Sequence, residues 1–431
     1  MEGWLDPSLS GRGRAPAAVI FDTPRRDSFL HGTRFEGRGA LPASSEADGH
    51  SAEATIRKGA DPLSPTGIPI AVATLIVALL AAEEGLAQEP ERVWTDVRTL
   101  TVEGQGWTDT EAPFDRFPAK ARGVVPEAVW SLSRSSAGIA VRFLTDANSI
   151  AARWTLTSSG LAMTHMPATG MSGLDLYVRM PVDQQKPPGQ VWHWVGVGRP
   201  EKQTNEAVLA GGIPPGEHEF ILYLPLYNGA ASVELGVPVG AKLAPAPPRG
   251  KPVAFYGTSI TQGGCACRTG MAYPAIVGRL LDVPTINLGF SGNGKMDPPV
   301  VDLLAELDAA AYVIDCCPNM TAELVAERTA PLVHRLREAR PDTPILLVEN
   351  IEYQASAFLP GARRGYQSKN EALRAEYEAL VAEGVTGLTY VEGDPLFGDD
   401  GEATVDGTHA TDLGFLRQAQ ALAPVLAGAL R

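Results

Sequence analysis

The sequence predicts an α/β protein, in which a three-layer α/β/α parallel sheet is preceded by an antiparallel β-sandwich. After residue 250, short continuous apolar runs alternate with segments of helical periodicity, a pattern typical of buried parallel strands covered by helices. Between about 90 and 245, alternating runs are separated by Gly, Pro and Asn, which is typical of antiparallel strands joined by turns. A Pro-rich segment over 246–250 is predicted as a stiff linker between the two parts.

The first 88 residues carry no pattern of a folded domain. Residues 1–64 are rich in Gly, Ser, Pro, Arg and Asp without a sustained period, which predicts a disordered leader. Residues 68–82 are a predominantly apolar run, followed by the small residues Gly85 and Ala87. This length suits a signal-peptide core and falls short of the roughly 20 residues of a spanning helix.

We therefore expect residues 65–88 to be a signal peptide cleaved after Ala87, preceded by an over-extended gene start. This predicts a secreted or periplasmic protein without stable membrane insertion. A membrane-anchored or cytoplasmic protein, with the apolar run as a short anchor or a buried helix, is the alternative.

Residues 89–245 are predicted to form a jelly-roll-like β-sandwich. All seven tryptophans precede the linker, and Trp192 and Trp194 are predicted to share one strand face. Core packing is favoured there over a surface that stacks sugars, because aromatic residues suit half-buried strands. Asp175 could reach a cleft of the following domain or cap a turn, and the sequence leaves both open.

Residues 251–431 carry the predicted parallel sheet. The expected strands cover 252–257, 284–289, 311–316, 343–348 and 387–391. The expected helices lie near 271–282, 297–309, 321–340, 367–382 and 411–429. Ser259, a glycine-rich loop around Gly292, and Asn319 each follow one of these strands, and open α/β sheets bind their ligands at that edge.

A serine, a histidine and an aspartate form a candidate catalytic triad. Ser259 lies in a turn after the strand Val253–Gly257, and Asp406 and His409 lie about 150 residues later. Ester hydrolysis by serine needs a base for the hydroxyl proton and a carboxylate to orient that base. The structural alternatives are a common strand-to-turn exit for Gly-x-Ser and an Asx-turn or N-cap for Asp-x-x-His.

An oxyanion hole is predicted from three donors at the same sheet edge. These are the backbone N–H of Ser259, the backbone N–H of Gly292 and the side-chain amide of Asn319. Glycine lets the backbone approach a ligand closely, and convergent donors stabilise the charge that develops in acyl transfer.

The order of these motifs resembles the SGNH, or GDSL-type, esterases and acylhydrolases. The resemblance implies a flavodoxin-like catalytic domain with Ser259, Gly292, Asn319 and His409 as the four block residues and Asp406 as the third triad member. Thr258 stands where the family often has Asp, and Pro318-Asn319-Met320 replaces Gly-x-Asn-Asp. The α/β-hydrolase elbow fits less well, because residue 261 is Thr where that motif needs Gly.

The N-terminal part adds to this resemblance. Its segment Gly173–Tyr177 reads Gly-Leu-Asp-Leu-Tyr and is similar to the Gly-x-Asp-Leu-Tyr signature of the all-β region before some SGNH esterase domains. The resemblance implies hydrolysis of short acyl esters, acetyl esters of carbohydrates among them, through an acyl-enzyme and without metal or organic cofactor. An acyltransferase to an alcohol and a non-catalytic carbohydrate-binding protein are the alternatives.

Charge and cysteine content limit the partners. The net charge of −14 over 431 residues excludes a generally basic surface for nucleic acid. The resemblance implies a small-molecule or carbohydrate ester as the partner. The four cysteines stand as Cys265, Cys267, Cys316 and Cys317, with a spacing that is poor for zinc. We expect at least one disulfide between the first pair and the second, and a cysteine nucleophile is less favoured than Ser259.

Overall fold

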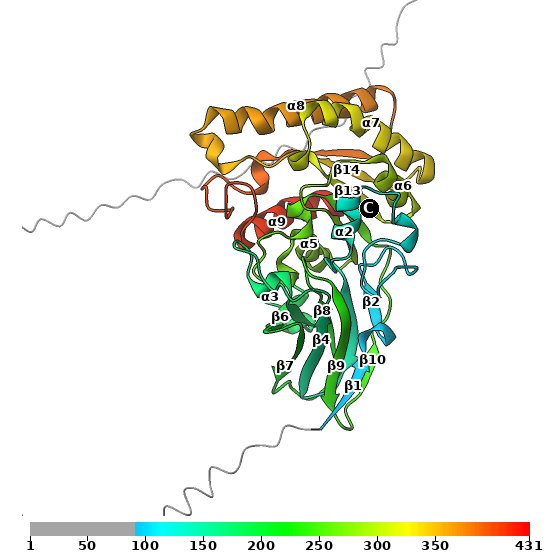
Figure 1. Ribbon diagram of the computed structural model, residues 1–431, viewed down its shortest axis with the longest axis vertical. Helices are drawn as coiled ribbons and strands as arrows, with labels where there is room; N and C mark the ends of the chain where they lie inside the picture. The colour runs from blue at the N-terminus through cyan, green and yellow to red at the C-terminus, as the bar shows by residue number, and fades with distance from the viewer. Residues whose placement is uncertain (1–90) are drawn as a thin grey trace, which may run out of the picture. The chain divides into compact units, whose positions relative to one another are not determined.

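Two antiparallel sheets precede a five-stranded parallel sheet in the computed structural model, which describes residues 91–431 (Figure 1). The leader predicted over 1–64 and the signal peptide predicted over 65–88 lie outside the described residues. Within 91–431, no helix has both the length and the apolar character needed to cross a membrane.

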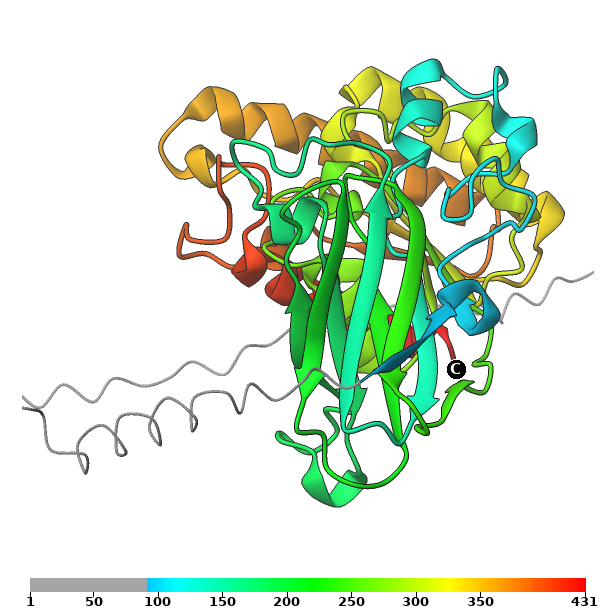
Figure 2. The ribbon, with the colours of Figure 1, turned by 60° about the horizontal axis from the view of Figure 1, so that its bottom comes forward.

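The antiparallel sheets form the predicted sandwich (Figure 2). One sheet has the strand order β1-β9-β4-β7, and the other has the order β10-β3-β8-β5-β6 with β2 paired to β3. Their bounds are β1 Arg92–Asp96, β2 Thr101–Glu103, β3 Ala140–Thr145, β4 Ser149–Leu156, β5 Leu174–Arg179, β6 Trp192–Gly198, β7 Thr204–Gly211, β8 His218–Tyr223, β9 Ala230–Pro238 and β10 Leu243–Pro245.

The core of the sandwich follows from strand alternation. Ile150, Ala152 and Trp154 project from the same face of β4 and are almost fully buried against Val141 and Phe143 of β3. A shift of one residue in register would move such side chains to the opposite face, so this apolar alternation fixes the pairing of the strands.

The parallel sheet has the order β12-β11-β13-β14-β15, which is the doubly wound order of flavodoxin-like folds. Its strands are β11 Val253–Gly257, β12 Thr285–Gly289, β13 Ala311–Asp315, β14 Ile345–Val348 and β15 Leu388–Val391. Its main helices are α5 Tyr273–Leu281, α6 Pro298–Glu306, α7 Ala322–Ala339, α8 Pro360–Ala382 and α9 Asp412–Ala429. The α/β fold predicted from the sequence is confirmed, and every expected strand and helix is present; α8 begins at Pro360, earlier than the expected residue 367, with Pro in its first turn.

Alternation along β11 divides the apolar core between the two faces of the parallel sheet. Ala254 and Tyr256 pack on the side of α6, α7 and α8, whereas Val253 and Phe255 pack on the side of α5 and α9. Figure 1 shows α7 and α8 on the face away from the sandwich, with α5 between the sheet and the sandwich. The short helix α2 (Glu127–Ser133) contributes Trp130 to the α6 side.

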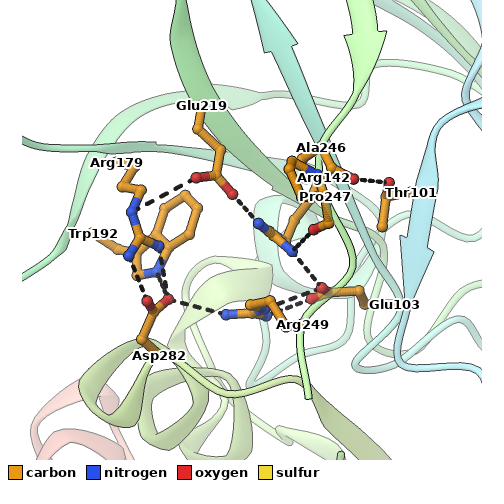
Figure 3. A network of polar contacts seen from close by, with 10 residues as sticks. All are labelled: Thr101, Glu103, Arg142, Arg179, Trp192, Glu219, Ala246, Pro247, Arg249 and Asp282. Carbon is orange, nitrogen blue, oxygen red and sulfur yellow. Dashed lines mark hydrogen bonds and ion pairs between the residues drawn. The ribbon is translucent and has the colours of Figure 1, made fainter. Parts of the chain in front are cut away.

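Polar side chains connect the sandwich to the α/β part around the end of α5 (Figure 3). Asp282, which caps α5, accepts hydrogen bonds from Arg179 of β5 at 2.6 Å and from Trp192 of β6 at 2.9 Å. Arg249, inside the segment predicted as a linker, pairs with both Asp282 and Glu103 of β2. This network holds the sandwich against the C-terminal end of α5.

Candidate active site

The first functional residue stands where β11 ends. The Thr258 hydroxyl accepts a hydrogen bond from the Ile260 N–H at 3.2 Å and caps the four-residue helix α4 (Ser259–Gln262). A Cβ atom at Gly257 would lie 2.0 Å from Thr261 Oγ1, so glycine is needed for this sharp exit. The turn expected for Ser259 is wrong, because the chain enters a helix there, and Ser259 is only 6% exposed.

Ser259, His409 and Asp406 form a continuous hydrogen-bonded series. Ser259 Oγ lies 2.9 Å from His409 Nε2, and His409 Nδ1 lies 2.7 Å from Asp406 Oδ2. A carboxylate beside Nδ1 favours the tautomer with its proton on Nδ1, which leaves Nε2 as the acceptor for the serine proton. The three residues are therefore placed as a nucleophile, a base and an orienting carboxylate would be.

The Asp406 carboxylate also supports its own loop. Its Oδ1 accepts hydrogen bonds from the N–H groups of Thr408 at 3.1 Å and His409 at 2.8 Å. Partial burial disfavours the charged carboxylate, but the hydrogen bonds from the His409 and Thr408 backbone and the His409 ring outweigh it and lower the pKa of Asp406. The Asp406 carboxylate therefore forms the Asx-turn with Oδ1 and the triad contact to His409 with Oδ2.

The predicted oxyanion residues lie on two loops packed against the nucleophile turn. Asn319 lies in the short 3-10 turn Cys317–Asn319. Its Oδ1 accepts a hydrogen bond from the Gly294 N–H at 3.1 Å, so the donor Nδ2 points away from Gly294. A Cβ atom at Gly294 would lie 2.1 Å from the Gly257 carbonyl oxygen, so the glycine loop lies directly on the end of β11. Gly292 has a φ of 69° and faces open space.

Asp175 of the Gly-x-Asp-Leu-Tyr segment holds the chain that follows the nucleophile. It is fully buried, and its carboxylate accepts hydrogen bonds from Arg268 at 2.7 Å, the Gly270 N–H at 3.0 Å and Trp194 at 2.8 Å. Asp175 therefore positions the loop after α4, which is neither of the two roles that the sequence left open, a cleft residue or a turn cap. Trp192 is buried at the junction, whereas Trp194 is 50% exposed.

The expected disulfide is wrong, because all four cysteines are free. Cys316 and Cys317 are fully buried and pack in the apolar core on the α6, α7 and α8 side of the sheet. Cys265 lies beside His409, and Cys267 lies beside Asp412 of α9, on the α5 and α9 side. The parallel pairing of β11 with β13 brings the two segments to the same edge, yet the cysteine pairs face different sides of it.

Two residues that the sequence did not single out for this place border the triad. The ring centroid of His165 lies 5.9 Å from that of His409, although His165 belongs to the loop between β4 and the short helix α3 (Ala168–Met171). Cys265 is buried beside His409, with a φ of 74°. One potential ligand atom from each of His165, Cys265 and His409 lies within 4.8 Å of the others. Only the packing of the sandwich against the α/β part brings His165 to Cys265 and His409.

Asp315 is a fully buried carboxylate at the end of β13, beneath α4. Burial raises the pKa of Asp315 to about 6, although Tyr273, Thr261 and Gln418 donate hydrogen bonds to it. Between about pH 4 and pH 6 the folded chain therefore retains a proton that the unfolded chain has lost. The resulting stabilisation is complete below the unfolded pKa and is lost as the pH rises through 6.

We predict that Asp315→Asn, which keeps the size and an acceptor but cannot titrate, removes this pH dependence. The free energy of unfolding of the variant relative to wild type should rise by about 3 kcal/mol between pH 4 and pH 7, since one pKa unit corresponds to about 1.4 kcal/mol. Urea denaturation at several pH values measures it. Parallel pH profiles for the two proteins would show that Asp315 keeps its ordinary pKa.

Two family models together match nearly all of the described chain. The model of the GDSL-like lipase/acylhydrolase family matches residues 250–427, and the model for the N-terminus of SGNH-hydrolase-type esterases matches residues 92–243. The second model carries the Gly-x-Asp-Leu-Tyr name that the segment around Asp175 suggested. No curated protein matches the chain.

Solved structures extend the comparison. A protein from Bacteroides ovatus ATCC 8483, assigned as a GDSL-like lipase, is 35% identical, with a TM-score of 0.73 over 79% of this chain and 98% of its own. A salicylyl-acyltransferase from a tetracycline biosynthetic pathway shares the fold at 19% identity and a TM-score of 0.65, over 79% of this chain and 99% of its own. An acetyl xylan esterase from the rumen bacterium Butyrivibrio proteoclasticus shares it at 11% identity and a TM-score of 0.50, over 79% and 98%. The resemblance drawn from the motifs is confirmed: the chain belongs to the GDSL-like lipase/acylhydrolase family and is a carboxylic ester hydrolase of the SGNH type.

Proposed function

We propose that this esterase hydrolyses short-chain acyl esters through an acyl-enzyme formed on Ser259. The observation that carries the proposal is the series from Ser259 Oγ to His409 Nε2 at 2.9 Å and from His409 Nδ1 to Asp406 at 2.7 Å. These separations allow proton transfer without rearrangement of the side chains.

The proposed reaction has two matched halves. His409 Nε2 takes the Ser259 proton as Oγ bonds to the ester carbonyl carbon, and the oxyanion accepts hydrogen bonds from the N–H groups of Ser259 and Gly292 and from Asn319 Nδ2. The carbon–oxygen bond to the alcohol then breaks, and His409 gives its proton to the leaving alcohol. Water next attacks the acyl-enzyme, its proton passes to His409, and Ser259 regains that proton as the acid leaves.

Acetyl esters of carbohydrates are the substrate class that we propose. The acetyl xylan esterase of Butyrivibrio proteoclasticus has this fold, and an acidic chain with a net charge of −14 favours neutral sugar esters over polyanionic substrates. The fold also serves the salicylyl-acyltransferase, so transfer to an alcohol acceptor is tested in parallel with hydrolysis.

The test is a p-nitrophenyl acyl series from acetate to palmitate, followed by acetylated xylan, each with and without an added alcohol. Free acid as the product and a preference for acetate support the proposal. A new ester formed with the added alcohol would identify an acyltransferase, and turnover that increases toward palmitate would contradict the short-chain assignment.

Asn319→Ala should lower kcat by about a hundredfold while KM changes little, because an oxyanion donor bonds mainly the transition state. Steady-state kinetics with p-nitrophenyl acetate measure both constants. Loss of Oδ1 also frees the Gly294 N–H, so Asn319→Asp, which keeps that acceptor and removes the donor, serves as the matched variant. If KM rises and kcat holds in both, Asn319 binds substrate instead.

We also propose that residues 65–88 direct export and that the mature enzyme begins near Gln88, in a secreted or periplasmic form. The support is the apolar run over 68–82 with small residues at Gly85 and Ala87, since a short apolar core followed by small residues at the cleavage site is the pattern of a signal peptide. Intact-mass analysis of exported protein should show the shortened chain. A retained residue 1 would contradict the proposal.

A further inference from the structure

His165, Cys265 and His409 supply two imidazoles and a thiol to one point beside the Ser259 hydroxyl, with their ligand atoms within 4.8 Å of one another. We propose that these three side chains bind a zinc ion and that the bound ion holds the esterase inactive. The inference rests on the proposed role of His409 as the base. It concerns a reversible inhibitory site and not a cofactor of the reaction.

His409 is already oriented as a zinc ligand would be. Its Nδ1 is held by Asp406 at 2.7 Å, so Nε2 points outward with a free electron pair toward Ser259. Histidine ligands of zinc commonly donate their second ring N–H to a carboxylate, which fixes the tautomer and the ring orientation. The arrangement that prepares His409 to accept a proton therefore also prepares it to accept a metal ion.

Cys265 is held in a conformation that its residue type disfavours. Its φ of 74° is in the left-handed region, and it is 6% exposed. Residues held in this region of backbone conformation cluster at active sites and ligand clamps. A Cβ atom added at the preceding Gly264 would lie 3.6 Å from His409 Cδ2, so this loop lies against the imidazole. The thiolate is a soft ligand that suits zinc.

His165 reaches the site from the sandwich on a short, well-anchored turn. Met163 and Met166 exchange two backbone hydrogen bonds of 3.0 and 3.2 Å around it, and Met166 is buried in the core next to α5. The Thr169 hydroxyl of the adjoining α3 donates to the Cys267 carbonyl oxygen at 2.5 Å. These bonds hold the exposed His165 turn beside the loop that carries Cys265.

Two nitrogens and one sulfur are a sufficient protein ligand set for four-coordinate zinc, with water in the fourth position. Zinc bonds of about 2.0–2.3 Å place tetrahedral ligand atoms roughly 3.3–3.8 Å apart, so the side chains need to close by about 1 Å. On binding, the Cys265 thiol releases its proton to solvent, and His409 Nε2 bonds the metal in place of the Ser259 hydroxyl. The base is then withheld from the nucleophile, which stops acyl transfer.

Binding is tested on the full-length chain with cobalt(II) and with zinc, independently of any ester. The wild type should bind one ion and show the thiolate-to-cobalt charge-transfer absorption. Cys265→Ser should lose that absorption, and His165→Ala should weaken binding by at least about 30-fold, since even outer-shell partners of zinc are worth 10- to 100-fold. Cys267→Ser is the matched control and should bind as the wild type does.

Inhibition is measured in each variant against its own metal-free rate. Zinc should inhibit the wild type reversibly, with activity restored by a chelator, and the inhibition constant of His165→Ala should shift by the same factor as its binding constant. Equal inhibition of all variants, or no metal-dependent absorption in the wild type, overturns the inference. If the metal binds as predicted but no ester is hydrolysed, the metal site is supported and the proposed esterase function is wrong. If esters are hydrolysed but no metal binds, the metal site is wrong and the proposed function is unaffected.

Discussion

Ser259→Ala is expected to abolish ester turnover, with a fall in kcat of roughly 10⁵- to 10⁶-fold, the loss typical of a serine nucleophile that acts within a triad. The variant lacks the oxygen that bonds the acyl group, so no acyl-enzyme can form. Activity on p-nitrophenyl acetate measures the loss. Mass spectrometry after a rapid quench should detect acylated wild type and no acylated variant.

The fold of the Ser259→Ala variant should be retained. The hydroxyl bonds His409, whereas α4 is capped by Thr258 and its C-terminus by Gly263. The melting temperature should therefore stay close to that of wild type. Ser291→Ala removes a hydroxyl from the neighbouring glycine loop and is the matched control, for which most activity should remain. A Ser259→Ala variant with more than a few per cent of wild-type activity would exclude Ser259 as the nucleophile.

The sequence predicted the parallel sheet well because its elements depend on local pattern. The strands β11 and β12 begin and end within one residue of the expected 252–257 and 284–289. Both are continuous apolar runs that become buried on both faces, and that burial is what their composition encodes. The helices α7 and α9 lie inside their expected ranges for a similar reason, since each presents a periodic apolar stripe.

The candidate triad was also accessible from sequence, because its members stand directly after predicted strands or before a predicted helix. The topology then requires that residues at the carboxyl ends of parallel strands share an edge. Ser259 and Asn319 follow β11 and β13, which are hydrogen-bonded neighbours. The sequence predicted that they share this edge, because the alternation of strands and helices indicates a parallel sheet; that β11 and β13 are direct neighbours comes from the structure.

Features that depend on tertiary packing could not be predicted from the sequence. His165 reaches His409 through a loop of the sandwich, and the buried bonds of Asp175 to Arg268 and Gly270 cross between the two parts. No periodicity within either segment encodes that approach. The disulfide expectation failed for a related reason. The expected disulfide was inferred from the proximity of the two cysteine pairs at the sheet edge. A disulfide bond also requires that the cysteine side chains face each other.

Asp406→Asn is expected to lower kcat by about 10³-fold or more while the chain stays folded. The asparagine amide would face His409 Nδ1 with a donor in place of an acceptor. The imidazole would then keep its proton on Nε2, where it can no longer accept the Ser259 proton, and this tautomer error costs about 10⁴-fold in a serine protease triad. Asparagine can still accept the Thr408 and His409 N–H groups with its carbonyl oxygen, as Asp406 Oδ1 does.

Because asparagine can still accept these two N–H groups, the Asp406→Asn variant separates the two roles of Asp406. If the carboxylate served only to support the Asx-turn, Asp406→Asn would be nearly neutral and Asp406→Ala would be destabilised and less active. If it orients the base, Asp406→Asn should lose activity while its melting temperature stays near that of wild type. Asp400→Asn is the matched control. Asp400 pairs with Arg417 in the same region and, within residues 91–431, makes no hydrogen bond or ion pair with Ser259, His409 or Asp406. The Asp400→Asn variant should be less stable than wild type, with kcat unchanged. An Asp406→Asn variant that keeps more than a tenth of wild-type kcat would show that the carboxylate does not act in the mechanism.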